Sequence, residues 1–212
     1  MMKRFVFLST GFLAGIASAG LGPSQPTVLV LGVGPLFFGA VLAALALTNS
    51  WPHVRPRIWG YFVGMCLSTL TYFVAFLTFI GAAGYAPQVL GLRSSADVVD
   101  FGADVLLGLF AASVVVSIGM ELLAYILSGR WSNLFLAFFL VASVTSLAAT
   151  YLIKGIATRF IHSNAPLLQY WSTLGTILTI GEALFCVVLG SQILQNPHRM
   201  ASMQDQGQVA GP

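Results

Sequence analysis

Two glutamates stand inside apolar segments of this chain, and their side chains are the best placed to do chemistry. Glu121 lies in SVVVSIGMELLAYIL, residues 113–127, and Glu182 lies in TILTIGEALFCVVLG, residues 176–190. A carboxylate in hydrocarbon costs about 2.5–3.5 kcal/mol on insertion scales, so such an acid normally faces a bundle interior, a wet cavity or a partner. A desolvated carboxyl group can also hold and release a proton near neutral pH. The pair therefore suggests proton or cation movement through a membrane.

Small polar residues recur around both glutamates at helical spacing. Residues three or four apart share one face of an α-helix. Three such faces are Ser113, Ser117, Glu121, Tyr125 and Ser128; Ser172, Gly175, Thr179, Glu182, Cys186 and Gly190; and Ser143, Ser146, Thr150 and Lys154. If these faces converge, they enclose a polar core. The candidate pathway residues are then Glu182, Glu121, Tyr125, Thr179, Ser117 and Lys154. The competing interpretation is helix packing, for which membrane helices also use Ser, Thr and Gly.

The two glutamates differ in predicted depth. Glu182 lies about twelve residues, or roughly 18 Å along a helix, from either end of its apolar segment. Glu121 lies only about six residues, or roughly 9 Å, from the cytoplasmic end of its own. We therefore expect Glu182 to be protonated at neutral pH unless water or Lys154 reaches it, and Glu121 to face the cytoplasmic interface.

A second acidic group lies outside the apolar segments. Asp97, Asp100 and Asp104 follow the sequence RSSA at spacings of three and four, which places them on one face of a helix start. Acids in a first helical turn are stabilised by the helix dipole, and Ser94 or Ser95 can serve as a cap. The alternative is a cation-attracting mouth on the outer side of the membrane.

Enzyme chemistry finds no support in the sequence. The three histidines fall in loops or in the tail, and no HExxH, GxSxG or P-loop pattern occurs. We therefore predict no cofactor and no metal site, and no motif points to a known family. Cys66 and Cys186 lie inside apolar segments without a CxxC pattern, so we interpret them as small apolar residues in helix contacts. Their similar predicted depth leaves proximity open.

The composition predicts which secondary-structure elements position these residues. The 212 residues are 58% hydrophobic and only 7% charged, whereas soluble chains carry roughly 25% charged residues. Apolar runs recur at about the 18-residue length that a ~30 Å hydrocarbon layer requires. We predict an all-α transmembrane bundle, residues 1–195, followed by a polar, disordered cytoplasmic tail, residues 196–212. The expected spans are 5–21, 27–47, 58–82, 101–127, 134–153 and 167–194.

Basic residues give the orientation. With the N-terminus inside, six of the nine Lys and Arg lie on the cytoplasmic side and three lie outside, the latter being Arg93, Lys154 and Arg159. The positive-inside rule then places both termini in the cytoplasm of a bacterial-type inner membrane. We interpret these charges as topology signals and expect no nucleic-acid partner.

The first 19 residues also fit a cleaved signal peptide, with Ala17-Ser18-Ala19 as the cleavage site. Cleavage would leave five spans. Against it, Gly11 and Gly15 form a small-xxx-small face that would serve a retained, packed helix.

Two functional hypotheses remain from the sequence alone. The first is a small transport or translocation module that uses Glu182 and Glu121 to handle a small molecule or an ion. The second is a non-catalytic membrane subunit or scaffold whose polar faces serve packing and assembly with a membrane-protein partner or a second copy. A hydrated cavity that reaches Glu182 favours the first, and tight packing around a hydrogen-bonded Glu182 favours the second.

Overall fold

The computed structural model describes residues 2–21, 26–50, 58–89, 103–129, 131, 133–160 and 166–194. Side chains are described within 2–20, 31–50, 59–85, 105–129, 131, 133–148, 150–151 and 175–194. These residues contain no strand and form six helices: α1 (Met2–Leu21), α2 (Pro26–Leu47), α3 (Ile58–Val89), α4 (Ala103–Ser128), α5 (Phe135–Phe160) and α6 (Pro166–Leu194). The all-α prediction is confirmed. Every predicted span coincides with a helix, although α3 and α5 continue beyond their predicted ends.

Three helices are long and apolar enough to cross a membrane. The qualifying stretches are Trp59–Tyr85 of α3, Val105–Ser128 of α4 and Gly175–Leu194 of α6. Within the described ranges, Leu31–Leu47 and Phe135–Ala148 are apolar but shorter. The chain is thus compatible with a helical membrane protein. Among the described residues, three of the six predicted spans meet the length and composition that a membrane span requires.

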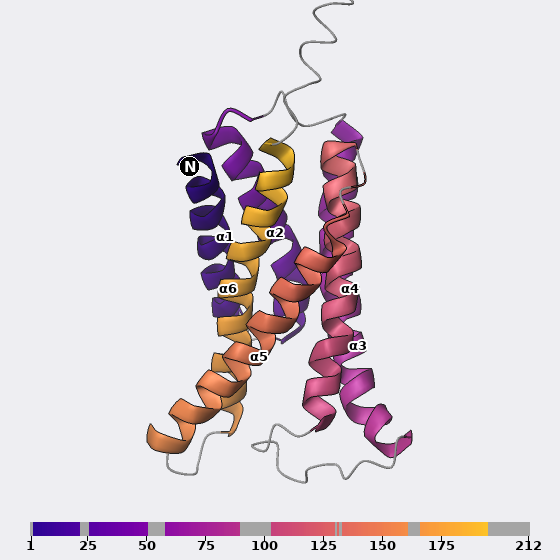
Figure 1. Ribbon diagram of the computed structural model, residues 1–212, viewed down its shortest axis with the longest axis vertical. Helices are drawn as coiled ribbons and strands as arrows, with labels where there is room; N and C mark the ends of the chain where they lie inside the picture. The colour runs from indigo at the N-terminus through magenta and orange to yellow at the C-terminus, as the bar shows by residue number, and fades with distance from the viewer. Residues whose placement is uncertain are drawn as a thin grey trace, which may run out of the picture.

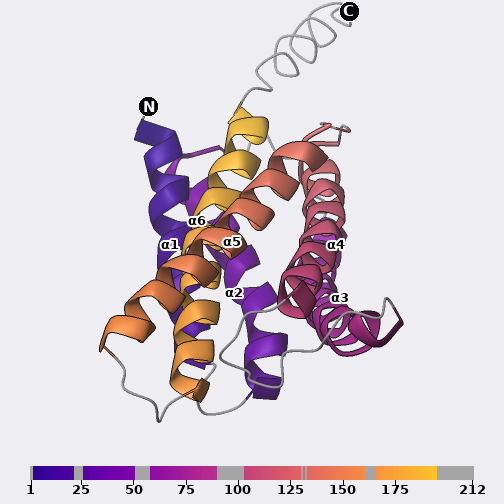
Figure 2. The same ribbon diagram turned by 60° about the horizontal axis from the view of Figure 1, so that its bottom comes forward.

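Successive helices run in opposite directions (Figure 1). The N-terminal end of α1 and the C-terminal ends of α2, α4 and α6 lie toward the upper end of the bundle in that view. Helix α5 begins beside α4 and crosses the bundle obliquely to reach α6 (Figure 2). Both described ends of the chain therefore lie at one end of the bundle, as expected for an even number of antiparallel helices.

The packed core occupies that same end. Its largest fully buried side chains come from the start of α1 and α5 and from the later parts of α2, α4 and α6: Phe7, Phe37, Leu45, Met120, Leu123, Phe138, Leu189 and Ile193. Large apolar side chains also cover the outer surface of α3, among them Phe62, Phe73 and Leu77. An apolar exterior of this extent suits contact with lipid.

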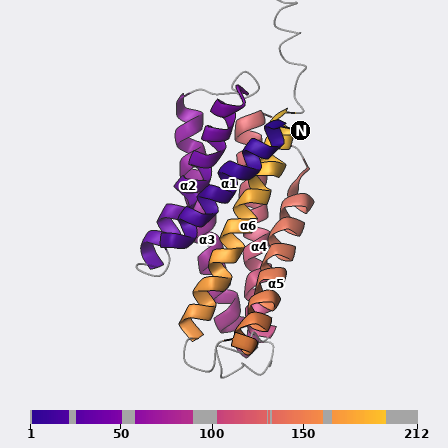
Figure 3. The ribbon, with the colours of Figure 1, turned by 90° about the vertical axis from the view of Figure 1, so that its left-hand side faces the viewer.

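Glycines bring α1 into backbone contact with α6, its most extensive partner (Figure 3). A Cβ on Gly11 would lie 2.7 Å from the carbonyl oxygen of Glu182 and 2.8 Å from the Cβ of Cys186. A Cβ on Gly15 would collide with the backbone of Thr179. The predicted small-residue face is confirmed, and the helix that a signal peptidase would remove is here part of the bundle.

Helix α2 is continuous through a stretch rich in Gly and Pro. The sequence LGVGPLFFG places Gly32, Gly34 and Pro35 together, a combination that favours a bend. The helix nevertheless continues through Pro35. Beside it, the Ser68 hydroxyl of α3 donates a hydrogen bond to the Gly34 carbonyl at 3.0 Å. This turn of α2 is therefore hydrogen-bonded to α3.

Candidate functional site

A cavity of about 180 Å3 lies among α3, α4, α5 and α6, with Val33 of α2 also contributing to its wall. Its lining comes from the first half of α4 and from the middle of α3, α5 and α6. The cavity borders the packed core, because Ala142 and Phe185 belong to both. Most of the wall is apolar, and the polar side chains in it are Tyr72, Ser113, Thr145, Ser146, Thr150 and Glu182.

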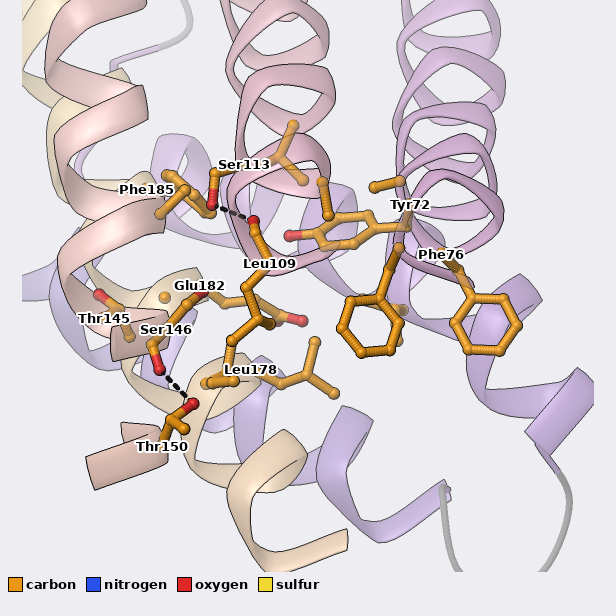
Figure 4. Close-up of a pocket in the computed structure, with 18 of the residues that line it drawn as sticks. Tyr72, Phe76, Leu109, Ser113, Thr145, Ser146, Thr150, Leu178, Glu182 and Phe185 are labelled. Carbon is orange, nitrogen blue, oxygen red and sulfur yellow. Dashed lines mark hydrogen bonds between the residues drawn. The ribbon is translucent and has the colours of Figure 1, made fainter. Parts of the chain in front are cut away.

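Glu182 brings the single carboxyl group to this wall. It projects from the middle of α6 into the space between the helices (Figure 4). The residue is only 1% exposed, and neither carboxyl oxygen has a hydrogen-bond partner among the described residues. Leaving a buried polar group unpaired costs about 1–3 kcal/mol, and native structures hold few such groups. The arrangement is unusual for a carboxyl whose only task is packing.

Tyr72 approaches the same space from α3, on the opposite side (Figure 4). Its hydroxyl is also buried without a hydrogen-bond partner in the described part of the chain. On the α1 side, the Ser18 hydroxyl, which has no other partner in the described part of the chain, lies close enough to Glu182 to serve as a hydrogen-bond donor to its carboxyl. Hydroxyl groups from α1 and α3 therefore lie on two sides of the carboxyl from α6.

Two hydroxyls of the cavity wall already donate hydrogen bonds to backbone carbonyls of their own helices. Ser113 donates to the Leu109 carbonyl at 2.8 Å, and Thr150 donates to the Ser146 carbonyl at 2.7 Å (Figure 4). Such bonds to the preceding turn are common for Ser and Thr in membrane helices. The oxygen lone pairs remain able to accept a hydrogen bond. Toward the cavity, both residues therefore act as acceptors.

Glu121 is a residue of α4 that lies outside the cavity, beside the start of α5. After α4 the chain turns back through Gly129 and Asn133, both with positive φ, and Trp131 stacks on Tyr125 with ring centroids 4.8 Å apart. The Leu134 amide then donates a hydrogen bond to Oε2 of Glu121 at 2.9 Å. Glu121 is 7% exposed. It lies near the expected end of the bundle, but it is buried and caps the start of α5 instead of facing an interface.

The other predicted pathway residues with described side chains do not line the cavity. Ser117 is buried in α4 and donates to the Ser113 carbonyl, outside the cavity lining. Thr179 donates to the Gly175 carbonyl at 2.7 Å and lies against α1. Tyr125 is 38% exposed. Of the six candidates, Glu182 is the one described side chain that lines the cavity.

Several predictions fall outside the described residues. Asp97 and Asp100 lie there, and so do the side chains of Asp104 and Lys154 and the tail 196–212. Their roles stay predictions. The two thiols are free, with Cys66 exposed and Cys186 buried.

Sequence reasoning missed Tyr72 and the aromatic wall. Phe76, Phe79 and Phe185 line the cavity with it. The available signal was that Tyr72 follows Ser68 by four residues in an otherwise apolar helix. That spacing indicates a shared face, but it does not indicate which neighbouring helix the face meets.

The fold and the site define a class: a helical protein with membrane-length helices and a buried, unpaired carboxyl in a cavity of the bundle. Within the described residues, no group of three or more His, Cys, Asp or Glu side chains could hold a metal ion. No protein-family model, curated protein or solved structure matches this chain.

Proposed function

We propose that this chain is a six-span protein of a bacterial-type cytoplasmic membrane that moves protons or cations through the Glu182 cavity. Both termini lie in the cytoplasm in this proposal. Lys and Arg counts and the common position of the two described chain ends support that orientation. The packed core then lies toward the cytoplasm, and the cavity borders it on the outer side.

The observation that carries the proposal is the unpaired Glu182 carboxyl in the cavity. A carboxyl retained for packing is expected to be hydrogen-bonded to a neighbour, because the unpaired group is costly in a low-dielectric interior. A carboxyl that exchanges a proton or a cation needs free oxygens and space beside them. Glu182 has both.

Helix packing supplies a route to the required conformational change. The pairs α1–α6 and α3–α4 have the most extensive contacts, whereas α4 and α6 touch little, and both α2 and α5 join the two pairs. The cavity lies between these pairs. Rocking of one rigid unit against another around a central site is the common mechanism of alternating access. In this proposal α1–α6 and α3–α4 are the units, and opening the core end would expose Glu182 to the cytoplasm.

Proton flux in reconstituted vesicles tests this proposal. Vesicles that enclose a pH-sensitive dye are prepared with wild type, Glu182→Gln and Glu121→Gln, and a pH gradient is imposed. We expect flux from wild type and from Glu121→Gln, because Glu121 lies outside the cavity, and loss of flux from Glu182→Gln. Equal flux from wild type and Glu182→Gln would remove Glu182 from any proton-coupling role.

The second candidate function is a scaffold, favoured by one set of observations. The hydroxyls of Ser113, Ser117, Thr150 and Thr179 all donate within their own helices. Glycines also hold α1 tightly against α6. In a scaffold these features serve packing, with a membrane-protein partner or a second copy on the outer surface. Glu182→Gln would then leave assembly unchanged and no flux would be seen in any variant.

A further inference from the structure

We propose that the ligand of the Glu182 cavity is a small organic ammonium cation of about the size of one aromatic ring. The inference rests on the proposed function, because it names the substrate class of the same site. In this arrangement the ammonium group lies against the Glu182 carboxylate, and the organic part lies against the aromatic wall.

The cavity wall presents oxygen atoms that can accept hydrogen bonds, which favours a ligand that donates them. Glu182 presents two unpaired oxygens, and the hydroxyls of Ser113 and Thr150 present lone pairs because their protons are already used. Tyr72 adds a hydroxyl oxygen from the other side. A primary ammonium group brings three N–H donors and no acceptor. It can therefore bind to these oxygens alongside the hydroxyl groups of Tyr72 and Ser18, which can also donate to the Glu182 carboxyl.

The charge of the wall selects a cation. Glu182 is the one acid in the lining, and no Lys, Arg or His side chain accompanies it among the described lining residues. A carboxylate in such a place needs a positive partner, since an isolated buried charge is very costly. A proton or a bound cation can fill that role, and the two exclude each other on one carboxyl. Binding of the ammonium cation therefore displaces the Glu182 proton, which couples the two movements.

The apolar part of the wall favours an organic cation over an inorganic one. A hard metal ion such as Ca²⁺ takes six to eight oxygen ligands, typically several carboxylates and carbonyls. The cavity offers one carboxyl and a few hydroxyls, and its other sides are aromatic or aliphatic. The rings of Tyr72, Phe76, Phe79 and Phe185 suit an organic cation, because aromatic faces attract ammonium groups within about 6 Å.

The volume limits the size of the ligand. The cavity measures about 180 Å3, and an engineered apolar cavity of roughly 150 Å3 in another protein accepts benzene. One ring with a short ammonium arm, such as benzylammonium, therefore fits. A bulky lipophilic cation such as tetraphenylphosphonium does not.

Calorimetry on the full-length protein in lipid nanodiscs tests the inference with three probes: benzylammonium, its neutral analogue benzyl alcohol, and tetraphenylphosphonium. We expect wild type and Glu121→Gln to bind benzylammonium equally. Glu182→Gln should bind it at least about tenfold more weakly, because the variant keeps an acceptor oxygen but loses the negative charge that pairs with the ammonium group. Neither benzyl alcohol nor tetraphenylphosphonium should show binding that depends on Glu182. Equal affinity of benzylammonium for wild type and Glu182→Gln, or Glu182-dependent binding of tetraphenylphosphonium, would overturn the inference.

A second variant serves if Glu182→Gln does not fold. Ala112 of α4 lines the cavity, so Ala112→Phe fills the space and leaves the carboxyl in place. It should abolish benzylammonium binding, and retained binding would contradict the site.

The vesicle assay separates the two proposals. Glu182-dependent proton flux without benzylammonium binding refutes the ligand and leaves proton transfer standing. Glu182-dependent binding without flux, in vesicles both with and without benzylammonium, refutes transport and leaves the ammonium site standing.

Discussion

Replacing Glu121 with alanine should destabilise the start of α5. The Leu134 amide donates to Oε2 of Glu121 at 2.9 Å, and the carboxyl group is almost entirely buried. Leu134 immediately precedes α5, and backbone N–H groups at a helix start have no partner within the helix. Glu121 on α4 therefore provides the cap that the chain before α5 does not.

The magnitude follows from the two interactions that are lost. A hydrogen bond to a charged group contributes about 1.5–3 kcal/mol, and its removal leaves a buried amide unpaired. A negative charge beside a helix N-terminus adds roughly 0.3–1 kcal/mol. We expect Glu121→Ala to cost about 2–4 kcal/mol of unfolding free energy. Glu121→Gln keeps an acceptor oxygen and should cost under about 1 kcal/mol, since chiefly the charge term is removed.

Unfolding in mixed micelles, monitored by tryptophan fluorescence, measures this difference. Trp131 stacks on Tyr125 beside the cap, so its fluorescence reports the same region. The control is Ser9→Ala, which removes an outward-facing hydroxyl bonded within α1 and should change stability by no more than about 0.5 kcal/mol. A cost for Glu121→Ala equal to that of Glu121→Gln would refute the cap, because the two variants differ in the acceptor.

The remaining predictions concern packing, topology and the outer acids. Gly15→Ala should destabilise the protein by about 1–3 kcal/mol through overpacking against α6, whereas Gly20→Ala, which faces open space, should be neutral or slightly stabilising; chemical unfolding that ranks the two alike would contradict the α1–α6 contact. Reporter fusions in the α2–α3 and α4–α5 connections should report the cytoplasm, and fusions between α3 and α4 the outside; a cytoplasmic signal from the latter would overturn the topology. The double variant Asp97→Asn with Asp100→Asn should cost at most about 1 kcal/mol if the acids only stabilise a helix start, and loss of a divalent-cation dependence with folding unchanged would instead identify an ion-binding mouth.

Sequence alone was sufficient to predict the helices, because apolar runs of membrane length leave no other regular structure that satisfies the backbone. It also predicted the Gly11 and Gly15 contact, since small residues at that spacing let two helices approach closely. The inward position of Glu182 followed from the cost of exposing a carboxyl to lipid.

The arrangement around each glutamate could not be predicted in this way. Helical spacing placed Thr179 and Glu182 on one stripe, but α1 covers Thr179 while Glu182 lines the cavity. A stripe indicates a face and does not indicate which helix meets it. Glu121 can cap α5 only because the chain reverses direction after α4. Gly129 and Asn133, both with positive φ, lie in this reversal, and helical spacing within α4 does not predict it. Tyr72 was missed because its polar neighbours come from other helices.

Infrared difference spectroscopy tests most directly whether the Glu182 carboxyl is reachable from water. Spectra of wild type and Glu182→Gln in lipid nanodiscs isolate the carbonyl stretch of this one acid, first in H₂O and then after transfer to D₂O. An exchangeable carboxyl in the cavity predicts a carboxylic band, absent from Glu182→Gln, that shifts in D₂O while the protein stays folded and that disappears when benzylammonium binds. A band that neither shifts in D₂O nor responds to the cation would contradict the account, because it would show Glu182 sealed within a packed scaffold.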